Sequence, residues 1–306
     1  MIDHITCKAT KREFMKHNIL SDDKFIVKRT FNPKTNEVGY PMKTELGNLN
    51  IIITDKGAYI KNSIHSYFNY FTESKIHNCN DFSLCDLKFI ISQIEKELNY
   101  NLKDTKLNSL EFGFNLDLNF PVEKFIIENV LMYKLKSHCF NPKDKANMVM
   151  KKFKSSNYEI KIYDKSGHLN YYKPNILRIE IRYKTSKEFN KFGIYNLTDL
   201  KNPLALDMLF NDFINKFSYL TIIDSYNGNI DTPQKERLKL IKYTNPNFWI
   251  ETRNKHHPNT LKNRKDDFER IMSKYNLDNW KNTLISLLYE KYQHLSKDEC
   301  NQSIPA

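Results

Sequence analysis

Glycine, proline and cysteine are scarce in this chain of 306 residues. Seven glycines and ten prolines argue against a fibrous or disordered protein, because such proteins are enriched in these residues. The five cysteines are an odd number and include no Cys-x-x-Cys pair, which disfavours a disulfide framework and a zinc ribbon. No run approaches the roughly 18 uninterrupted apolar residues of a membrane span, and no signal-peptide pattern is visible. We therefore expect a cytoplasmic protein without a membrane partner.

Positive charge and aromatic residues are plentiful. Apolar residues make up 40% of the chain and aromatic residues 13%, which is enough for a hydrophobic core. The formal net charge is +12, and a basic excess favours a polyanionic partner. A membrane surface or a lysine-rich genome would account for the same excess, so the charge alone identifies no partner.

The spacing of apolar residues predicts a mixed fold. Period-two alternation predicts strands, and three- to four-residue spacing predicts helices. The expected strands are 2–7, 50–54, 58–61, 110–118, 158–163 and 177–183, and the expected helices are 84–98, 122–135, 185–192, 204–219, 232–243 and 278–295. Strand patterns become rare after about Leu200. We interpret residues 1–199 as an α+β domain and residues 200–306 as a helical extension.

Three of the expected strands separate apolar from polar side chains, because successive side chains point to opposite faces. Their polar faces carry acids, cations and one tyrosine: Glu111, Asn115, Glu159, Lys161, Tyr163, Lys165, Arg178, Glu180 and Arg182. If these strands are neighbours in one sheet, the polar side chains would lie together. Simpler interpretations are also open. Glu180 between two arginines is typical of a solvated ion pair. A tyrosine in a lysine-rich strand is usually a surface residue, and the chain has eighteen tyrosines.

This set of residues suits phosphodiester transesterification. A tyrosine oxygen attacks a backbone phosphate, a 3′-hydroxyl leaves, and a 5′-phosphotyrosine link forms. Tyr163 is the candidate nucleophile, and Lys161 and Lys165 would favour its phenolate. Glu111 and Glu180 are candidate ligands for Mg²⁺ or Mn²⁺.

Four segments resemble the gene II-type replication proteins of filamentous phages and their plasmid relatives, a branch of the rolling-circle initiators. They are Met1–Ile5, Asn108–Asn115, Glu159–Lys165 and Asn175–Lys184, the last continuing through Phe192–Ile194 and Leu197–Leu200. The resemblance implies an antiparallel sheet with packed helices in the nicking domain. It also implies Tyr163 as the nucleophile, Glu111 and Glu180 as metal-site acids, and Arg178 as a supporting cation.

The sequence departs from many rolling-circle initiators at one motif. Those proteins bind metal through a His-hydrophobic-His triplet, and this chain has no His-x-His. His65 could contribute one ligand, although a lone histidine is more often structural. Tyr158 is the reserve candidate for the nucleophile, but it falls one position out of step with the polar face.

Basic clusters indicate where DNA would bind. Residues 134–154 contain seven lysines against one aspartate, and phosphates are the obvious partner. The residues expected to contact DNA are Lys151, Lys152, Lys154, Arg178, Arg182, Arg253 and Lys255. Phe248 and Trp249 precede the last two and suit a strand-tracking surface, although Trp249 could equally lie in a core.

The sequence therefore predicts a rolling-circle replication initiator that nicks origin DNA, in the cytoplasm of the host cell if a phage encodes it. The expected partners are origin DNA, as supercoiled duplex and single strand, and a host helicase and polymerase. Two alternatives stay open. The first is a non-catalytic DNA-binding replication protein, and the second is a metal-dependent nuclease that activates water.

Overall fold

The computed structural model of the chain describes residues 1–32, 37–139, 149–166, 174–224 and 232–297. The strands are β1 (Ile2–Ala9), β2 (Lys28–Asn32), β3 (Glu37–Leu46), β4 (Leu49–Ile53), β5 (Ala58–Ser63), β6 (Thr105–Asp117), β7 (Val130–Tyr133), β8 (Met150–Lys154), β9 (Tyr158–Asp164), β10 (Ile176–Tyr183) and β11 (Leu220–Ile222). The helices are α1 (Arg12–Ser21), α2 (Ile64–Glu73), α3 (Leu84–Leu98), α4 (Val122–Glu128), α5 (Lys187–Asn190), α6 (Pro203–Ser218), α7 (Gln234–Tyr243), α8 (Pro246–Lys255), α9 (Pro258–Lys274) and α10 (Asn279–Ser296).

Nine of the strands form one antiparallel sheet, so the fold is α+β as predicted. Their order is β2-β3-β4-β5-β1-β6-β10-β9-β8, and β11 pairs with β7 in a second, two-stranded sheet. Strands β6, β10 and β9 are direct neighbours. The three strands whose polar faces were expected to meet therefore lie side by side, in the half of the large sheet that ends at β8.

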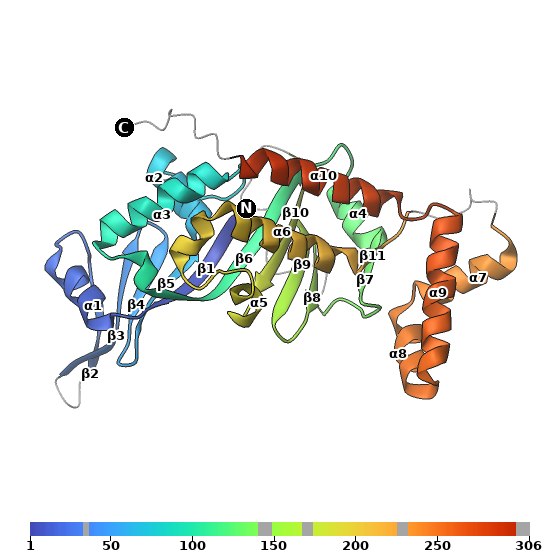
Figure 1. Ribbon diagram of the computed structural model, residues 1–306, viewed down its shortest axis with the longest axis horizontal. Coiled ribbons are helices and arrows are strands. Elements are labelled where there is room, and N and C mark those ends of the chain that lie inside the picture. Colours follow the sequence, from blue (N-terminus) through green and yellow to red (C-terminus); the bar gives the residue numbers. More distant parts are fainter. Residues whose placement is uncertain (33–36, 140–148, 167–173, 225–231, 298–306) are drawn as a thin grey trace.

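Helices cover one face of this sheet, with α3, α6 and α10 lying in front of it in Figure 1. The apolar side of β6 packs against these helices: the rings of Phe112 and Phe114 lie 5.7 Å and 5.3 Å from that of Phe213 in α6. Tyr292 of α10 lies 6.3 Å from Phe114. Burial of this side of the sheet leaves the polar sides of β6, β9 and β10 facing away from the helices.

The chain has a second, smaller core. Trp249 is fully buried there among residues of α7, α8 and α9, and its indole nitrogen donates to the carbonyl of Tyr243 at 2.7 Å. In contrast, α6 and α10 belong to the main core. The hydrophobic contacts therefore do not divide the chain at residue 200, and the boundary between residues 199 and 200 stays a prediction.

One local expectation is wrong, and several strands were not predicted. The predicted helix 122–135 ends at Glu128, and Val130–Tyr133 forms β7 instead. Pairing with β11, almost ninety residues later in the chain, was not visible in local periodicity. Strands β2, β3, β8 and β11 were not predicted at all. No helix in the described part of the chain is long and apolar enough to cross a membrane.

Candidate functional site

The register of three strands brings Tyr163 to the two predicted acids. Glu180 of β10 pairs directly with Gly113 of β6 and with Lys161 of β9, and directly paired residues share a face. The hydroxyl of Tyr163 donates to Oε2 of Glu180 at 3.3 Å. Glu111 lies on the same face, one pair further along β6. The structure thus places the tyrosine and both acids together.

A third acid, Asp3, completes the cluster. Ligand oxygens of Asp3, Glu111 and Glu180 all lie within 4.8 Å of one another, and all three residues are buried. Asp3 reaches the cluster because the pairing of β1 with β6 shifts register between Ile2 and Ile5. Sequence reasoning missed Asp3, although an acid in an apolar strand is a visible signal, because the shift cannot be read from alternation.

Two cations bridge the three carboxylates. The ammonium of Lys161 donates to Glu111 at 3.0 Å and to Glu180 at 2.8 Å. The guanidinium of Arg178 donates to Glu180 and to Asp3, both at 3.0 Å. When all three acids are ionised, three negative charges face two positive ones in direct contact, so one negative charge remains to attract a further cation.

The pKa values of the acids follow from this arrangement. Burial alone would raise the pKa of Asp3, but Arg178 and other positive neighbours lower it to about 2. Burial also opposes ionisation of Glu180, and Lys161 and Arg178 outweigh it, so the pKa of Glu180 is lowered. For Glu111, burial and the nearby Glu180 carboxylate raise the pKa. The cluster therefore holds at least two carboxylates in their ionised form near neutral pH.

The tyrosine differs from expectation in its ionisation. Burial, followed by the Glu180 carboxylate, raises the pKa of Tyr163 well above its ordinary value. Lys161 is held by the two glutamates, and the ammonium of Lys165 lies 5.8 Å from the Tyr163 ring centroid while donating to Asn78 at 2.6 Å. The expected effect of these lysines on the phenolate therefore does not outweigh burial and the Glu180 carboxylate in the protein alone.

The segment between α2 and α3 supports the cluster from one end of the sheet. Asn78 donates to Asp3 at 2.7 Å, and Asn115 of β6 donates to the carbonyl of Cys79 at 3.0 Å. His65 is buried, stacks on Phe82 with ring centroids 4.7 Å apart, and contacts Asn80 at 2.8 Å. His65 is thus not a member of the three-acid cluster, although it lies close enough to Asp3 to help lower the pKa of that acid.

Gly113 makes room for Glu180. A Cβ atom at Gly113 would lie 2.4 Å from the carbonyl oxygen of Ile179 and 2.6 Å from Cβ of Glu180. Both distances are far below ordinary contact, and the first involves backbone that cannot swing aside. A side chain at this position would therefore push β10 and its glutamate out of place.

We predict that Gly113→Ala lowers the free energy of unfolding by about 2 kcal/mol, the typical cost of overpacking, and displaces Glu180. Urea denaturation measures the change. Gly39→Ala is the matched control, because a Cβ there meets nothing closer than 3.9 Å, and its cost should stay within about 0.5 kcal/mol. Equal costs for the two variants would contradict the close approach of β6 and β10.

The predicted DNA contacts fall into two groups. Lys151 is 5% exposed and donates to the carbonyls of Ile127 and Val130 on the helix-covered side. Arg178 is 2% exposed, and its guanidinium donates hydrogen bonds to Asp3, Glu180 and Asn115. The structure therefore does not support either residue as a phosphate contact, because their polar atoms are occupied inside the protein.

The other predicted contacts are more accessible. Lys152 and Lys154 pair in register with Lys161 and Glu159, so they lie on the face of Tyr163. Arg182 is on the same face, with its side chain 40% exposed and Nε 3.8 Å from Glu111.

The two basic residues of α8 lie away from this face. Arg253 is half-buried and donates to the carbonyl of Leu135 at 2.7 Å, which ties α8 to the turn after β7. Lys255 is exposed and lies 3.8 Å from Glu251. Arg253 thus has a structural contact, and binding of DNA at either residue stays a prediction.

The reserve nucleophile, Tyr158, lies on the other side of the sheet. Its hydroxyl contacts that of Tyr133 at 2.7 Å, and the ammonium of Lys216 in α6 lies 4.8 Å from its ring centroid. Tyr158 therefore faces the helices and is separated by the sheet from the acids.

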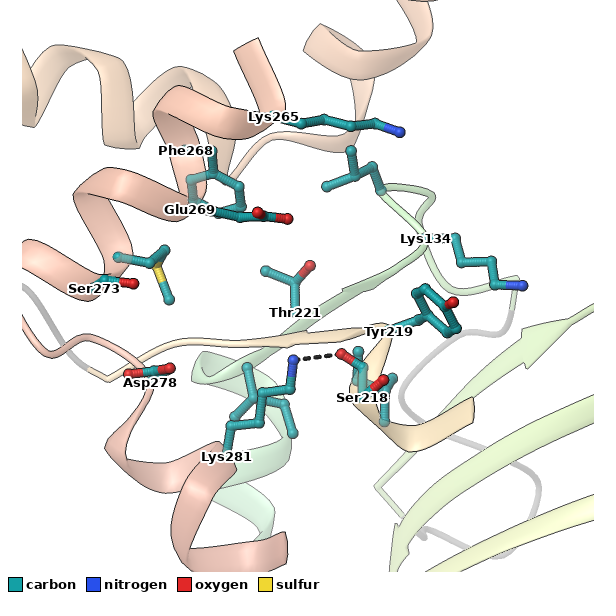
Figure 2. A pocket seen from close by; sticks show the side chains of 14 residues that line it. Lys134, Ser218, Tyr219, Thr221, Lys265, Phe268, Glu269, Ser273, Asp278 and Lys281 are labelled. Carbon is teal, nitrogen blue, oxygen red and sulfur yellow. Dashed lines mark hydrogen bonds between the residues drawn. The ribbon is translucent and has the colours of Figure 1, made fainter. Parts of the chain in front are cut away.

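A pocket of about 460 Å³ lies elsewhere, between the β7–β11 pair and the helices α9 and α10. Figure 2 shows Lys134, Tyr219 and Thr221 on one side of it, and Lys265 and Glu269 of α9 on the other. It includes neither Tyr163 nor any of the three clustered acids. The pocket is therefore separate from the candidate site.

Comparisons with known proteins are sparse. No protein-family model and no curated protein matches the chain. Among solved structures, the chain is similar to the rolling circle replication initiator protein from Geobacillus stearothermophilus. The two share 11% sequence identity and a TM-score of 0.43, over 76% of this chain and 89% of that one. This likeness is too remote to place the chain in a family or to transfer site residues.

Proposed function

We propose that this chain is a rolling-circle replication initiator that nicks origin DNA through Tyr163. The observation that carries the proposal is the 3.3 Å hydrogen bond from the Tyr163 hydroxyl to Glu180, one of three buried acids whose oxygens lie within 4.8 Å of one another. A nucleophile, an adjacent base and an oxygen-rich cation site are the parts that phosphodiester transesterification requires.

Each protein residue has a defined part in the step. Glu180 accepts the phenol proton, and the Tyr163 oxygen then forms a bond to the backbone phosphorus. The bond from phosphorus to the 3′-oxygen breaks, and that oxygen takes up a proton from water and leaves as a hydroxyl. Because the phosphotyrosine ester is itself a phosphodiester of similar energy, a later 3′-hydroxyl can attack it, release Tyr163 and close the strand.

The acids suit a hard divalent cation such as Mg²⁺ or Mn²⁺, which prefers carboxylate oxygens. The ion would be held by Asp3, Glu111 and Glu180. Its binding would replace some of the contacts that Lys161 and Arg178 make with these acids. The ion would polarise the phosphoryl oxygens and neutralise charge that develops on them. A bound ion near Tyr163 would also lower the pKa of the phenol.

The proposed partners follow from this chemistry. They are origin DNA, as supercoiled duplex and as single strand, together with a host helicase and polymerase that act after the nick in the cytoplasm. A non-catalytic DNA-binding protein would have no use for the buried acid cluster beside a tyrosine. A nuclease that activates water would use the acids but not the phenol.

The test is formation of a covalent adduct. Purified protein is incubated with Mn²⁺ and a supercoiled plasmid that carries the reading frame with its flanking DNA, and the products are separated in SDS. We expect nicked plasmid with protein bound to its 5′ end, and no adduct in EDTA. Nicked plasmid with a free 5′ end would favour the water-activating nuclease, and intact plasmid would favour the non-catalytic protein.

A further inference from the structure

The face of the sheet that bears Tyr163 has a second half, made by β1 to β5, that the proposed chemistry does not use. The register traces one row of side chains across it and onto β6: Lys28, Lys43, Ile52, Tyr59, Lys8 and Lys106. The alternate residues Ile51, Ile60 and Cys7 are buried in the main core. The row therefore lies on the face away from the helices, which none of the described helices covers.

This half of the sheet is strongly basic. Four lysines lie on it, at positions 8, 28, 43 and 61, and Lys106 of β6 adjoins them through its pairing with Lys8. None of the five forms an ion pair within the described part of the chain. Among the described side chains of β1 to β5, the carboxylates on this face are Asp3, in the acid cluster, and Glu45. We call these five lysines and Tyr59 the lysine face.

Two of the contacts across the lysine face join like charges. Lys28 pairs directly with Lys43, and Lys8 pairs directly with Lys106. Like charges directly opposite each other destabilise a sheet, and here no described carboxylate relieves them. A polyanion bound across the strands would reduce this repulsion, because its phosphates would lie between the ammonium groups.

An aromatic ring lies among these lysines. Tyr59 is half-buried, and the ammonium groups of Lys8 and Lys61 lie 5.9 Å and 5.3 Å from its ring centroid. Surfaces that bind single-stranded nucleic acid combine such cations with aromatic rings on which unpaired bases stack. A duplex keeps its bases stacked inside and would make no use of the ring.

The lysine face continues into the candidate site. Lys8 and Asp3 lie on the same strand, and β1 pairs directly with β6, which carries Lys106 at one end and Glu111 further along. We propose that the lysine face binds single-stranded DNA and leads it across the sheet to Tyr163. This inference rests on the proposed function and names the surface that carries the single strand to the same site.

The test measures single-strand binding without any chemistry. Tyr163→Phe protein in EDTA is titrated into a fluorescein-labelled oligothymidylate of about 20 nucleotides, longer than most single-strand binding sites, and anisotropy is followed at several salt concentrations. Reversing two exposed lysines, Lys43→Glu with Lys106→Glu, should weaken binding at least tenfold. The slope of log affinity against log salt should fall by about 1.4, because each lost phosphate contact removes about 0.7.

The matched control reverses two exposed lysines on helices of the covered side, Lys96→Glu in α3 with Lys124→Glu in α4. The change in net charge is identical, so affinity within about twofold of the parent protein would show that position matters. An equal loss in both double variants would overturn the lysine face as a site. So would a loss confined to duplex DNA of the same length.

The ring has its own test. Tyr59→Ala should weaken oligothymidylate binding at least fivefold, whereas Tyr59→Phe should retain it, since a stacked base needs only the aromatic face. An oligonucleotide with 5-iodouracil should photo-crosslink to the peptide that contains Tyr59. Crosslinks confined to other peptides would overturn the proposal. Because these assays contain no metal and no nucleophile, their results are independent of whether the wild-type protein nicks DNA.

Discussion

Replacing Tyr163 with phenylalanine should abolish covalent attachment to DNA while leaving the fold intact. The variant removes a single oxygen, which carries the 3.3 Å hydrogen bond to Glu180 and is the proposed nucleophile. Without it no phosphotyrosine bond can form, so the adduct should fall below detection in the SDS assay with Mn²⁺. Circular dichroism should stay unchanged, since Arg178 and Lys161 still pair with Glu180.

Tyr158→Phe is the matched control for this result. Tyr158 occurs on the same strand and is also buried, but its hydroxyl faces Tyr133 on the helix-covered side. The control should retain the adduct. Loss of the adduct in Tyr158→Phe alone, with Tyr163→Phe active, would move the nucleophile to the other side of the sheet and refute the proposed site.

Neutralising Glu180 should have the second large effect, on metal binding and on stability together. Glu180 is the acid that contacts both cations and the phenol. Glu180→Gln leaves Lys161 and Arg178 buried with one carboxylate fewer, and breaking a buried ion pair in this way costs about 3 kcal/mol. Binding of Mn²⁺, measured by calorimetry, should weaken at least tenfold, and the urea midpoint should fall.

Glu159→Gln is the matched control, because it removes an acid from the same face of the sheet without changing the three-acid cluster. Glu159 lies two residues from Lys161 on the same face and is 8% exposed, but it does not belong to the three-acid cluster. Its variant should bind Mn²⁺ like the wild type. If the two glutamine variants bound the ion equally well, the assignment of Glu180 as a ligand would be wrong.

Alternation along strands predicted the composition of the site. In β6, β9 and β10 each strand buries its apolar residues beneath helices, so the faces of Glu111, Tyr163 and Glu180 followed from period two. The assumption that these strands are neighbours, which alternation cannot supply, is confirmed by the sheet order. The same logic correctly placed Tyr158 on the opposite face.

Other features depend on contacts that local patterns do not record. Asp3 joins the acids through a register shift in β1, and β7 forms because β11 is available to pair with it. The basic character of residues 134–154 suggested a phosphate surface, but alternation in β8 turns Lys151 inward, to the carbonyls of Ile127 and Val130. Charge in the sequence therefore indicated a region, whereas the register decided which lysines face outward.

The lysine face was also hidden in the sequence. Its lysines are spread over residues 8–106 in five separate strands and form no charge run. Only the antiparallel register aligns them across the sheet with Tyr59 in their midst. The basic segments that are conspicuous in the sequence, in contrast, include Arg253, whose guanidinium is held by a backbone carbonyl.

Peptide mapping of the DNA adduct tests the central claim most directly. Trypsin cleaves after Lys161 and Lys165, so Tyr163 falls on a four-residue peptide of its own, whereas Tyr158 falls on the preceding one. After nuclease and trypsin digestion of the adduct, mass spectrometry should find the nucleotide on the peptide Ile162–Lys165. A nucleotide on any other tyrosine peptide would contradict the account.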